Sequence, residues 1–363
     1  MGEILGLGLT HYPGLIFPDA EMAVFLERTL ASGRVPEDFK DPARWPEPMR
    51  REWGADRGAT AAVEHRRRCV DALRRLRKEL DAFAPDFVVI WGDDQYENFR
   101  EDVIPPFCVF AVPEVECRPF AKKRAFTTST NVWGEPADTV VRLPGHPAGA
   151  RYLTNALLAA HFDMPYAYVT RYEFGLAHAF INTVLFLDWD RAGFPYPVVP
   201  FHVNCYGSAV VRRRGGMSQP QSPEPDPPAP SPARCFDVGA ATARALRASP
   251  WRVALIGSSS WSHAFLTEKT HGVYPDVAAD RARLEELRTG RFDRWRDLTL
   301  AELEDAGQHE FLNWLCLAGA MHELGRTAEI VDYVESYVFN SDKCFAVFRL
   351  GAARASRSAG SGG

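Results

Sequence analysis

The feature that most constrains the fold is a set of short, wholly apolar runs that alternate with amphipathic helical segments. One such run is Phe87–Trp91, which follows a helical pattern over about 60–83 and begins just after Pro85. A strand that is apolar on both faces is typical of the interior of a largely parallel sheet, because helices cover both of its sides. The chain is therefore expected to adopt an α/β fold.

The same alternation continues along the chain. Further strands are predicted near 4–9, 166–169, 197–203 and 253–256, and further helices near 148–160 and 237–248. Residues 36–57, rich in Pro, Trp, Arg and Glu, are expected to form an irregular surface excursion. We predict one α/β domain over 1–350, with a central mixed, largely parallel sheet flanked by helices and a largely helical C-terminal portion.

Two segments have compositions that disfavour regular structure. Residues 213–233 include a Pro- and Ser-rich stretch and are expected to form an exposed loop. Residues 351–363 are small and polar and are expected to form a flexible tail.

Composition excludes several classes of function. The 363 residues carry 42 Lys plus Arg against 47 Asp plus Glu, a net charge of −5, which gives no electrostatic footprint for nucleic acid. Seven dispersed cysteines without C-x-x-C spacing argue against a disulfide framework and a thiolate zinc site. No apolar run is long enough to span a bilayer, and the N-terminus is not a convincing signal peptide. A cytoplasmic enzyme without a membrane partner is expected.

Polar residues gather where the predicted strands end. His11 follows the first strand, Asp93–Gln95 follow Phe87–Trp91, and His263 follows the strand near 253–256, while His178 lies in the segment after the strand near 166–169. Open α/β sheets place their ligands at the carboxyl ends of the strands. The pattern favours a metal site or an acid/base site at this edge, since imidazoles and carboxylates serve both.

The residues by themselves leave simpler interpretations open. His11 and His178 are also compatible with hydrogen-bonded core histidines, and Asp93 and Asp94 with capping of the following turn. Ser262 and His263 are adjacent on the chain and therefore do not form a catalytic dyad. No Walker loop, Rossmann fingerprint, nucleophile elbow or His-Glu-x-x-His motif occurs in a supporting context, which removes most competing enzyme classes.

One stretch resembles a known family. Asp94-Gln95-Tyr96-Glu97-Asn98-Phe99, followed by Pro105-Pro106-Phe107-Cys108, is similar to the Asp-His-Tyr-Asn and Met-Pro-Pro-Phe-Cys segments of 2,3-dihydroxyphenylpropionate dioxygenases. These enzymes and the catalytic subunit of protocatechuate 4,5-dioxygenase form the class III extradiol ring-cleavage group. The likeness extends from His11 to about residue 345.

The resemblance implies an extradiol dioxygenase fold and an iron(II)-dependent cleavage of a catechol-type ring next to its hydroxyls, with dioxygen as co-substrate. His11 matches the first iron ligand, and Gln95 stands where the family has its second histidine ligand. Asp276 matches the carboxylate ligand, with Glu268 and Asp280 as nearby competitors. His178 matches the acid/base histidine. His263, Tyr96 and Asn98 are candidates for substrate orientation, and His263 also for catalysis. The group commonly forms homo-oligomers.

Gln95 leaves three outcomes open for the site. It holds iron through His11, Gln95 and Asp276; or it recruits Asp93, Asp94 or His263 and binds another divalent metal; or it has lost its metal. The corresponding alternative functions are a non-catalytic metal-binding or interaction protein, and an oxygenase or hydrolase that acts on a non-catechol substrate.

Overall fold

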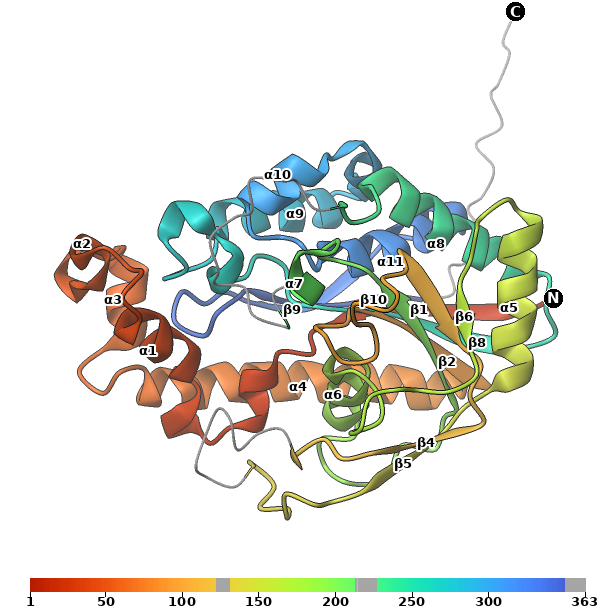
Figure 1. Cartoon of the computed structure of the whole chain (residues 1–363), viewed down its shortest axis with the longest axis horizontal. Coiled ribbons are helices and arrows are strands. Elements are labelled where there is room, and N and C mark those ends of the chain that lie inside the picture. Colours follow the sequence, from red (N-terminus) through yellow and green to blue (C-terminus); the bar gives the residue numbers. More distant parts are fainter. Residues whose placement is uncertain (122–130, 213, 215–226, 350–363) are drawn as a thin grey trace, which may run out of the picture.

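An eight-stranded sheet forms the centre of the computed structural model, which describes residues 1–121, 131–212, 214 and 227–349 (Figure 1). The strand order is β6-β3-β7-β2-β8-β1-β10-β9. The four central strands β7, β2, β8 and β1 are parallel, whereas β3 and β10 run antiparallel to their inner neighbours. The mixed, largely parallel sheet is thus confirmed. The strands are β1 Glu3–Leu9, β2 Phe87–Gly92, β3 Phe107–Phe110, β6 Tyr166–Ala167, β7 Val198–Val203, β8 Arg252–Ser258, β9 Glu329–Val334 and β10 Lys343–Phe348.

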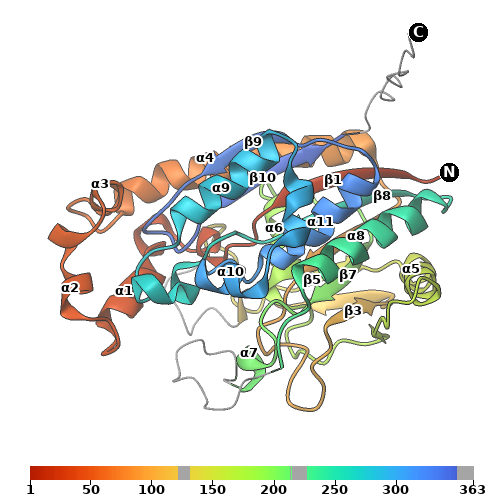
Figure 2. The same ribbon diagram turned by 90° about the horizontal axis from the view of Figure 1, so that it is seen from above.

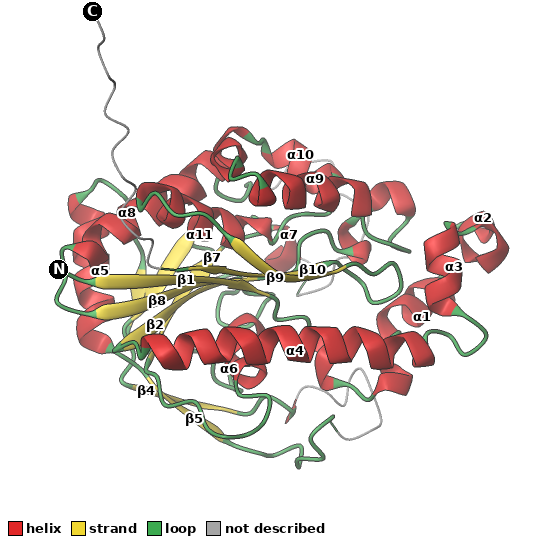
Figure 3. Cartoon of the chain, turned by 180° about the vertical axis from the view of Figure 1, so that it is seen from behind, coloured by secondary structure: helices red, strands yellow, loops and turns green. Residues whose placement is uncertain are grey.

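Helices cover both faces of the sheet (Figure 3). α4 (Ala59–Phe83) and α6 (His178–Leu187) pack on one face, and α5 (Pro147–Ala159), α8 (Pro232–Arg247) and α11 (Phe311–Glu323) contribute to the core on the other. α8 and α11 approach closely at Gly239, where a Cβ atom would stand 1.8 Å from the carbonyl oxygen of Cys316. Burial on both faces explains why β2 is apolar at every position.

The predicted surface excursion at 36–57 is partly wrong. The structure has two short helices there, α2 (Glu37–Lys40) and α3 (Glu47–Trp53), which lie with α1 (Val24–Ala31) at the end of the molecule away from the N-terminus (Figure 2). Trp45 and Met49 are buried, so the segment packs onto the molecule. The remaining elements are α7 Ala209–Arg212, α9 Val277–Arg288, α10 Leu300–Asp305 and a two-stranded sheet of β4 Glu114–Cys117 and β5 Val141–Pro144.

Two further boundaries differ from expectation. The largely helical C-terminal portion also contains β9 and β10, which extend the sheet beyond β1. Helix α8 begins at Pro232, five residues before the predicted start, because the Ser231 hydroxyl accepts from the backbone of Arg234 and caps it. Most of the predicted loop at 213–233, and the predicted tail at 351–363, lie outside the described residues.

Within the part of the chain that the structure describes, no helix combines the length and the apolar character needed to cross a membrane.

The parallel strands deliver their carboxyl ends to one edge of the sheet. β1 and β8 run in register from Glu3 opposite Arg252 to Leu9 opposite Ser258, and β2 lies on the other side of β8. The residues that follow β1, β8 and β2 therefore emerge side by side, although they are about 80 to 250 positions apart in the chain. This edge holds the candidate site.

Candidate metal centre

His11 is held in one orientation at the end of β1. Its Nδ1–H donates to the carbonyl oxygen of Ser258 at 3.0 Å, across the strand pair β1–β8. The amide of Asn182 in α6 donates to the His11 carbonyl at 3.1 Å. Because a carbonyl oxygen can only accept, the bond to Ser258 requires the proton to be on Nδ1. The lone pair of Nε2 is therefore free and points toward the strand edge, as in histidines that bind metals.

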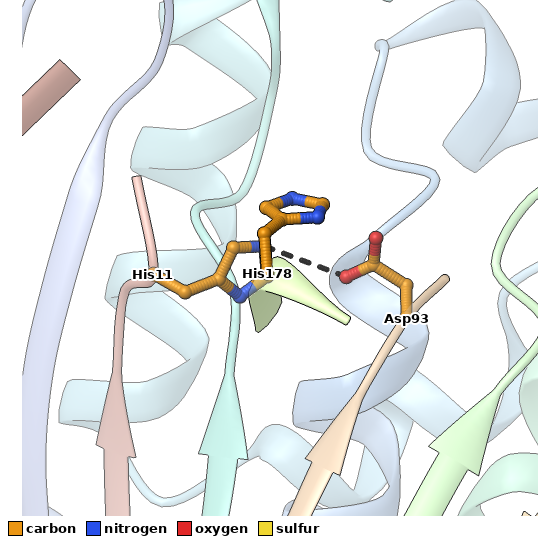
Figure 4. A group of neighbouring side chains, drawn as sticks. All are labelled: His11, Asp93 and His178. Atoms are coloured by element: carbon orange, nitrogen blue, oxygen red, sulfur yellow. Dashed lines mark ion pairs between the residues drawn. The ribbon is translucent and has the colours of Figure 1, made fainter. Parts of the chain in front are cut away.

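Two buried carboxylates face that nitrogen. Asp93 Oδ1 lies 3.4 Å from His11 Nε2, with Asp93 at the end of β2 (Figure 4). Glu310 Oε2 lies 3.3 Å from the same nitrogen and comes from the residue just before α11. Asp93 and Glu310 are almost wholly buried. Their carboxylates and the Nε2 atom of His11 all offer lone pairs, so they stabilise one another only through a shared proton or cation.

His263 approaches Glu310 from the other side. Its Nε2 also lies 3.3 Å from Glu310 Oε2, and its Nδ1–H donates to the carbonyl of Trp261 at 3.0 Å. Glu310 Oε2 thus stands between two imidazoles, each of which has its second nitrogen held by a backbone carbonyl. Burial lowers the pKa of His263, so the neutral ring is favoured.

His178 lies at the first position of α6, with its ring edge-on to His11 at a centroid distance of 5.2 Å (Figure 4). One ligand atom from each of His11, Asp93 and His178 lies within 4.8 Å of the others. The carboxylate of Glu97 accepts from the His178 Nδ1–H at 3.0 Å. Burial lowers the pKa of His178, but the charge and hydrogen bond of Glu97 outweigh it and raise the pKa to about 9.

Gln95 contacts the same centre through Glu310. Its Nε2 donates to Glu310 Oε1 at 3.3 Å and to the hydroxyl oxygen of Tyr206 at 2.8 Å. The Tyr206 hydroxyl in turn donates to Glu310 Oε1. These bonds satisfy one oxygen of Glu310 and leave Oε2 directed at the imidazoles.

The electrostatics of the centre favour a bound cation. Burial, followed by the negative charge of Glu310, raises the pKa of Asp93 to about 7. Burial also acts to raise the pKa of Glu310, but His263, His11 and Tyr206 hold it below its usual value. Two buried carboxylates that face the same imidazole are stabilised by a cation that they share, and a metal ion supplies one.

The donor atoms fit a divalent metal ion. Asp93 Oδ2 and Glu310 Oε2 are buried and have no hydrogen-bond partner among the residues that the structure describes, so both offer lone pairs to a metal ion. Neighbouring ligands of a metal with bonds of about 2.1 Å stand roughly 3 Å apart, close to the 3.3–3.4 Å separations around His11 Nε2. One imidazole and two carboxylates form an oxygen-rich donor set that suits a hard or borderline divalent ion.

The structure places Asp276 elsewhere. Its Oδ1 accepts from the backbone of Ala279 and caps α9, and its Oδ2 pairs with Lys269 Nζ at 2.6 Å. Asp280 is buried but accepts from the backbone of Ser262 and the amide of Gln308, which supports the loop before His263. Glu268 is exposed. The carboxylate beside His11 and His263 is that of Glu310.

Asp93 and Asp94 have different roles although they are adjacent. Asp94 accepts from the backbone N–H groups of Glu97, Asn98 and Phe99, and so closes the turn after β2. This is the capping role that the sequence left open for both residues, and only Asp93 faces His11.

The two candidate substrate residues lie on the same turn. The Tyr96 hydroxyl donates to Glu101, and Tyr96 itself has a φ of +62°, an uncommon conformation for a residue other than glycine. Asn98 Oδ1 accepts from the backbone of Arg171, while its buried Nδ2 has no hydrogen-bond partner within the described residues. Asn98 therefore keeps an unused donor.

Reasoning from the sequence missed Glu310, Glu97 and Tyr206. Glu310 lies about 300 residues after His11, just before an apolar helix, where acidic residues commonly occur for the helix alone. The available signal for this ligand was a glutamate directly before the apolar residues that begin a helix, in the segment Gln308-His309-Glu310.

The chain is similar in sequence to aromatic-ring dioxygenases. Residues 226–345, which include His263 and Glu310, match a family model described as the catalytic LigB subunit of aromatic ring-opening dioxygenase. A 2,3-dihydroxyphenylpropionate/2,3-dihydroxicinnamic acid 1,2-dioxygenase from Burkholderia vietnamiensis is 28% identical over 72% of this chain and 83% of its own length. A protein of the same name from Paraburkholderia phymatum is 28% identical over 73% of this chain and 84% of its own.

A solved structure of an uncharacterized protein from Escherichia coli K12 aligns with a TM-score of 0.45 and 14% identity, over 77% of this chain and 91% of that one. A likeness this distant supports no functional argument.

Proposed function

We propose that the chain is a member of the class III extradiol ring-cleavage dioxygenase family and a non-heme iron(II) dioxygenase that opens a catechol-type ring next to its hydroxyls; its similarity to the LigB family model and to curated dioxygenases supports this. The observation that carries this proposal is the position of Glu310 Oε2, which lies 3.3 Å from Nε2 of both His11 and His263 and has no hydrogen-bond partner among the described residues. A carboxylate next to an oriented imidazole such as His11 is the donor chemistry of non-heme iron sites.

In this proposal His11, Glu310 and Asp93 hold the metal. Gln95, which stands at the position of the family's second histidine, acts on the metal through Glu310, because its amide donates to Glu310 Oε1. The centre is therefore richer in oxygen donors than a site with two imidazoles and one carboxylate. Iron(II) in such a set is bound more weakly than with a second imidazole.

His178 and His263 are the groups suited to move protons. Each has one ring nitrogen held by an acceptor, Glu97 for His178 and the Trp261 carbonyl for His263, so the second nitrogen can exchange a proton with a substrate hydroxyl. When bound, the iron would supply the electron transfer between a deprotonated catechol and dioxygen. Asn98, with its unused buried donor, is the better placed of the two substrate candidates.

The substrate is proposed to be an aromatic vicinal diol. The relatives named above are 2,3-dihydroxyphenylpropionate and 2,3-dihydroxicinnamic acid dioxygenases, and their names specify such a ring. A panel of catechols with and without a side-chain carboxylate is therefore the appropriate assay set.

The test compares two carboxylate variants. Glu310→Gln removes the charge between the imidazoles, and we expect iron(II) affinity to fall by about tenfold or more, with loss of oxygen consumption. Asp276→Asn is the matched control, because asparagine preserves the cap of α9 and we expect it to bind iron(II) like the wild type. Anaerobic iron titration followed by oxygen-electrode assays with the catechol panel measures both.

Two results would contradict the proposal. Iron-loaded wild-type protein that consumes no oxygen with any catechol would overturn the activity. Loss of iron in Asp276→Asn together with full retention in Glu310→Gln would overturn the ligand assignment.

A further inference from the structure

The turn after β2 carries two side chains that contact the candidate metal centre. Gln95 reaches it through Glu310, and Glu97 reaches it through His178. The glutamate brings a charged group into a buried position, with 1% of its side chain exposed, which is costly unless a specific partner neutralises it.

Glu97 contacts His178 at two points. Its Oε2 accepts from the ring Nδ1–H at 3.0 Å, and its Oε1 accepts from the backbone N–H of His178 at 3.2 Å. His178 is the first residue of α6, and Ala177 before it gives no side-chain cap. The carboxylate therefore acts as the cap of the helix and as the acceptor for the ring in one group.

The carboxylate is itself held in place by the turn. The backbone N–H of Gln95 donates to Glu97 Oε2 at 3.4 Å, and the backbone N–H of Glu97 donates to Asp94 Oδ1 at 2.9 Å. The ring that Glu97 orients lies edge-on to His11, in the same group of ligand atoms as Asp93. Rotation of the His178 ring away from the centre would leave the buried carboxylate without this donor.

We propose that Glu97 is the positioning residue for His178: it keeps Nδ1 protonated and bonded to its own carboxylate, and it directs the opposite ring nitrogen to the metal centre. The catalytic consequence rests on the proposed function, since it assigns to His178 the proton exchange with the catechol. In that exchange the second nitrogen, Nε2, gives a proton to an oxygen of the product and regains one from a substrate hydroxyl, while Nδ1–H stays bonded to Glu97. The proton count of the reaction is unchanged.

The first experiment uses metal-free protein and needs no activity. Long-range ¹H–¹⁵N spectra of histidine-labelled protein report the tautomer and charge of each ring, and His178→Gln assigns its signals. We expect wild-type His178 to show a protonated Nδ1, and Glu97→Gln to shift this signal or mix the tautomers. Glu97→Asp, which keeps a carboxylate, is expected to restore part of the wild-type signal.

Glu173→Gln is the matched control, because Glu173 is an exposed carboxylate five residues before His178. We expect it to leave the His178 signal unchanged. Unchanged signals of the distant His65 and His146 in Glu97→Gln would show that the variant is folded. A folded Glu97→Gln with a wild-type His178 signal would overturn the proposal.

The second experiment uses the iron-loaded enzyme. We expect Glu97→Gln to lower kcat by about 10- to 100-fold with KM within roughly threefold, because general acid/base catalysis contributes factors of this size or more. In a His178→Gln background the same change should add less than about threefold, since the two residues act as one unit. A full additional loss in that background would overturn the positioning role.

The two proposals fail in different ways. If the wild-type protein cleaves no catechol, the proposed function fails, and the tautomer measurement still decides whether Glu97 orients His178. If the wild type is active and the His178 signal is indifferent to Glu97, only the positioning role fails.

Discussion

Gln95 and Glu310 together set the donor character of the centre. Gln95 donates to Glu310 Oε1, and the Tyr206 hydroxyl donates to the same oxygen, so this oxygen is occupied and Oε2 is available. In the proposed metal site, an amide at position 95 has two expected consequences: it offers no nitrogen donor to the metal, and it holds the carboxylate of Glu310 in place.

Replacing this amide by an imidazole tests that reading. We expect Gln95→His to raise iron(II) affinity by about tenfold or more, because imidazole is the stronger donor for iron(II) than a neutral amide oxygen. Competition with a chromophoric chelator measures the affinity, and catechol cleavage is expected to increase with it.

Gln95→Leu is the control, since it removes the hydrogen bond to Glu310 without adding a donor, and we expect weaker binding. Equal affinity in wild type and Gln95→His would show that residue 95 does not face the metal.

At the scale of elements, β7 contains a buried titratable group that links stability to pH. His202 is 3% exposed, and burial lowers its pKa to about 3 from the usual 6.5. The folded state therefore excludes a proton that the unfolded chain binds. This contribution to stability is fully present above about pH 6.5 and is lost as the pH falls toward 3.

His202→Gln removes this proton uptake. We expect the free energy of unfolding of the wild type to fall between pH 7 and 4.5 by on the order of 2 kcal/mol more than that of the variant. Urea denaturation at a series of pH values measures the difference. The exposed His322 provides the comparison, because His322→Gln should leave the pH dependence as in the wild type; identical slopes for all three proteins would contradict the assignment.

The central strands and the long helices could be predicted from local pattern, and there are physical reasons why other elements were missed. The helix near 60–83 and the strands around 87–91 and 253–256 were found because their apolar periodicity is strong. β9 is only partly buried and follows a helix and a short loop, so no continuous apolar run marks it. The short helices at 37–53 are stabilised by burial of Trp45 and Met49, which proline-rich composition does not reveal.

At the scale of the whole molecule, the buried lysine Lys343 connects the segment that carries His11 with the segment that carries His263. Lys343 is wholly buried at the start of β10, donates to the carbonyls of Phe339 and Ser341, and lies 4.1 Å from the ring centroid of Tyr12, next to His11. The same segment accepts from the backbone of Ala264, next to His263, through the Asn340 carbonyl.

Removing this charge should be costly. We expect Lys343→Met to lower the free energy of unfolding by about 3 kcal/mol or more, because it removes a buried cation that acts on the buried carboxylate of Asp342 and on the partly buried carboxylate of Glu52. Lys78→Met, at an exposed position of α4, is the control with little expected effect. Equal stability of the two variants in thermal or urea unfolding would show that Lys343 is dispensable.

The sequence by itself determined the α/β class, the strands of the sheet interior and the strand ends that carry His11, Asp93 and His263. Local patterns suffice for these, because a buried strand must be apolar and its carboxyl end is marked by the change to polar residues. Only the tertiary structure decided that Glu310 supplies the carboxylate between His11 and His263, that Asp276 caps a helix, and that Glu97 holds His178. The contacts of Glu310 with His11 and of Glu97 with His178 join residues about 300 and 80 positions apart, and the order of strands in the sheet, which no local pattern encodes, brings them together.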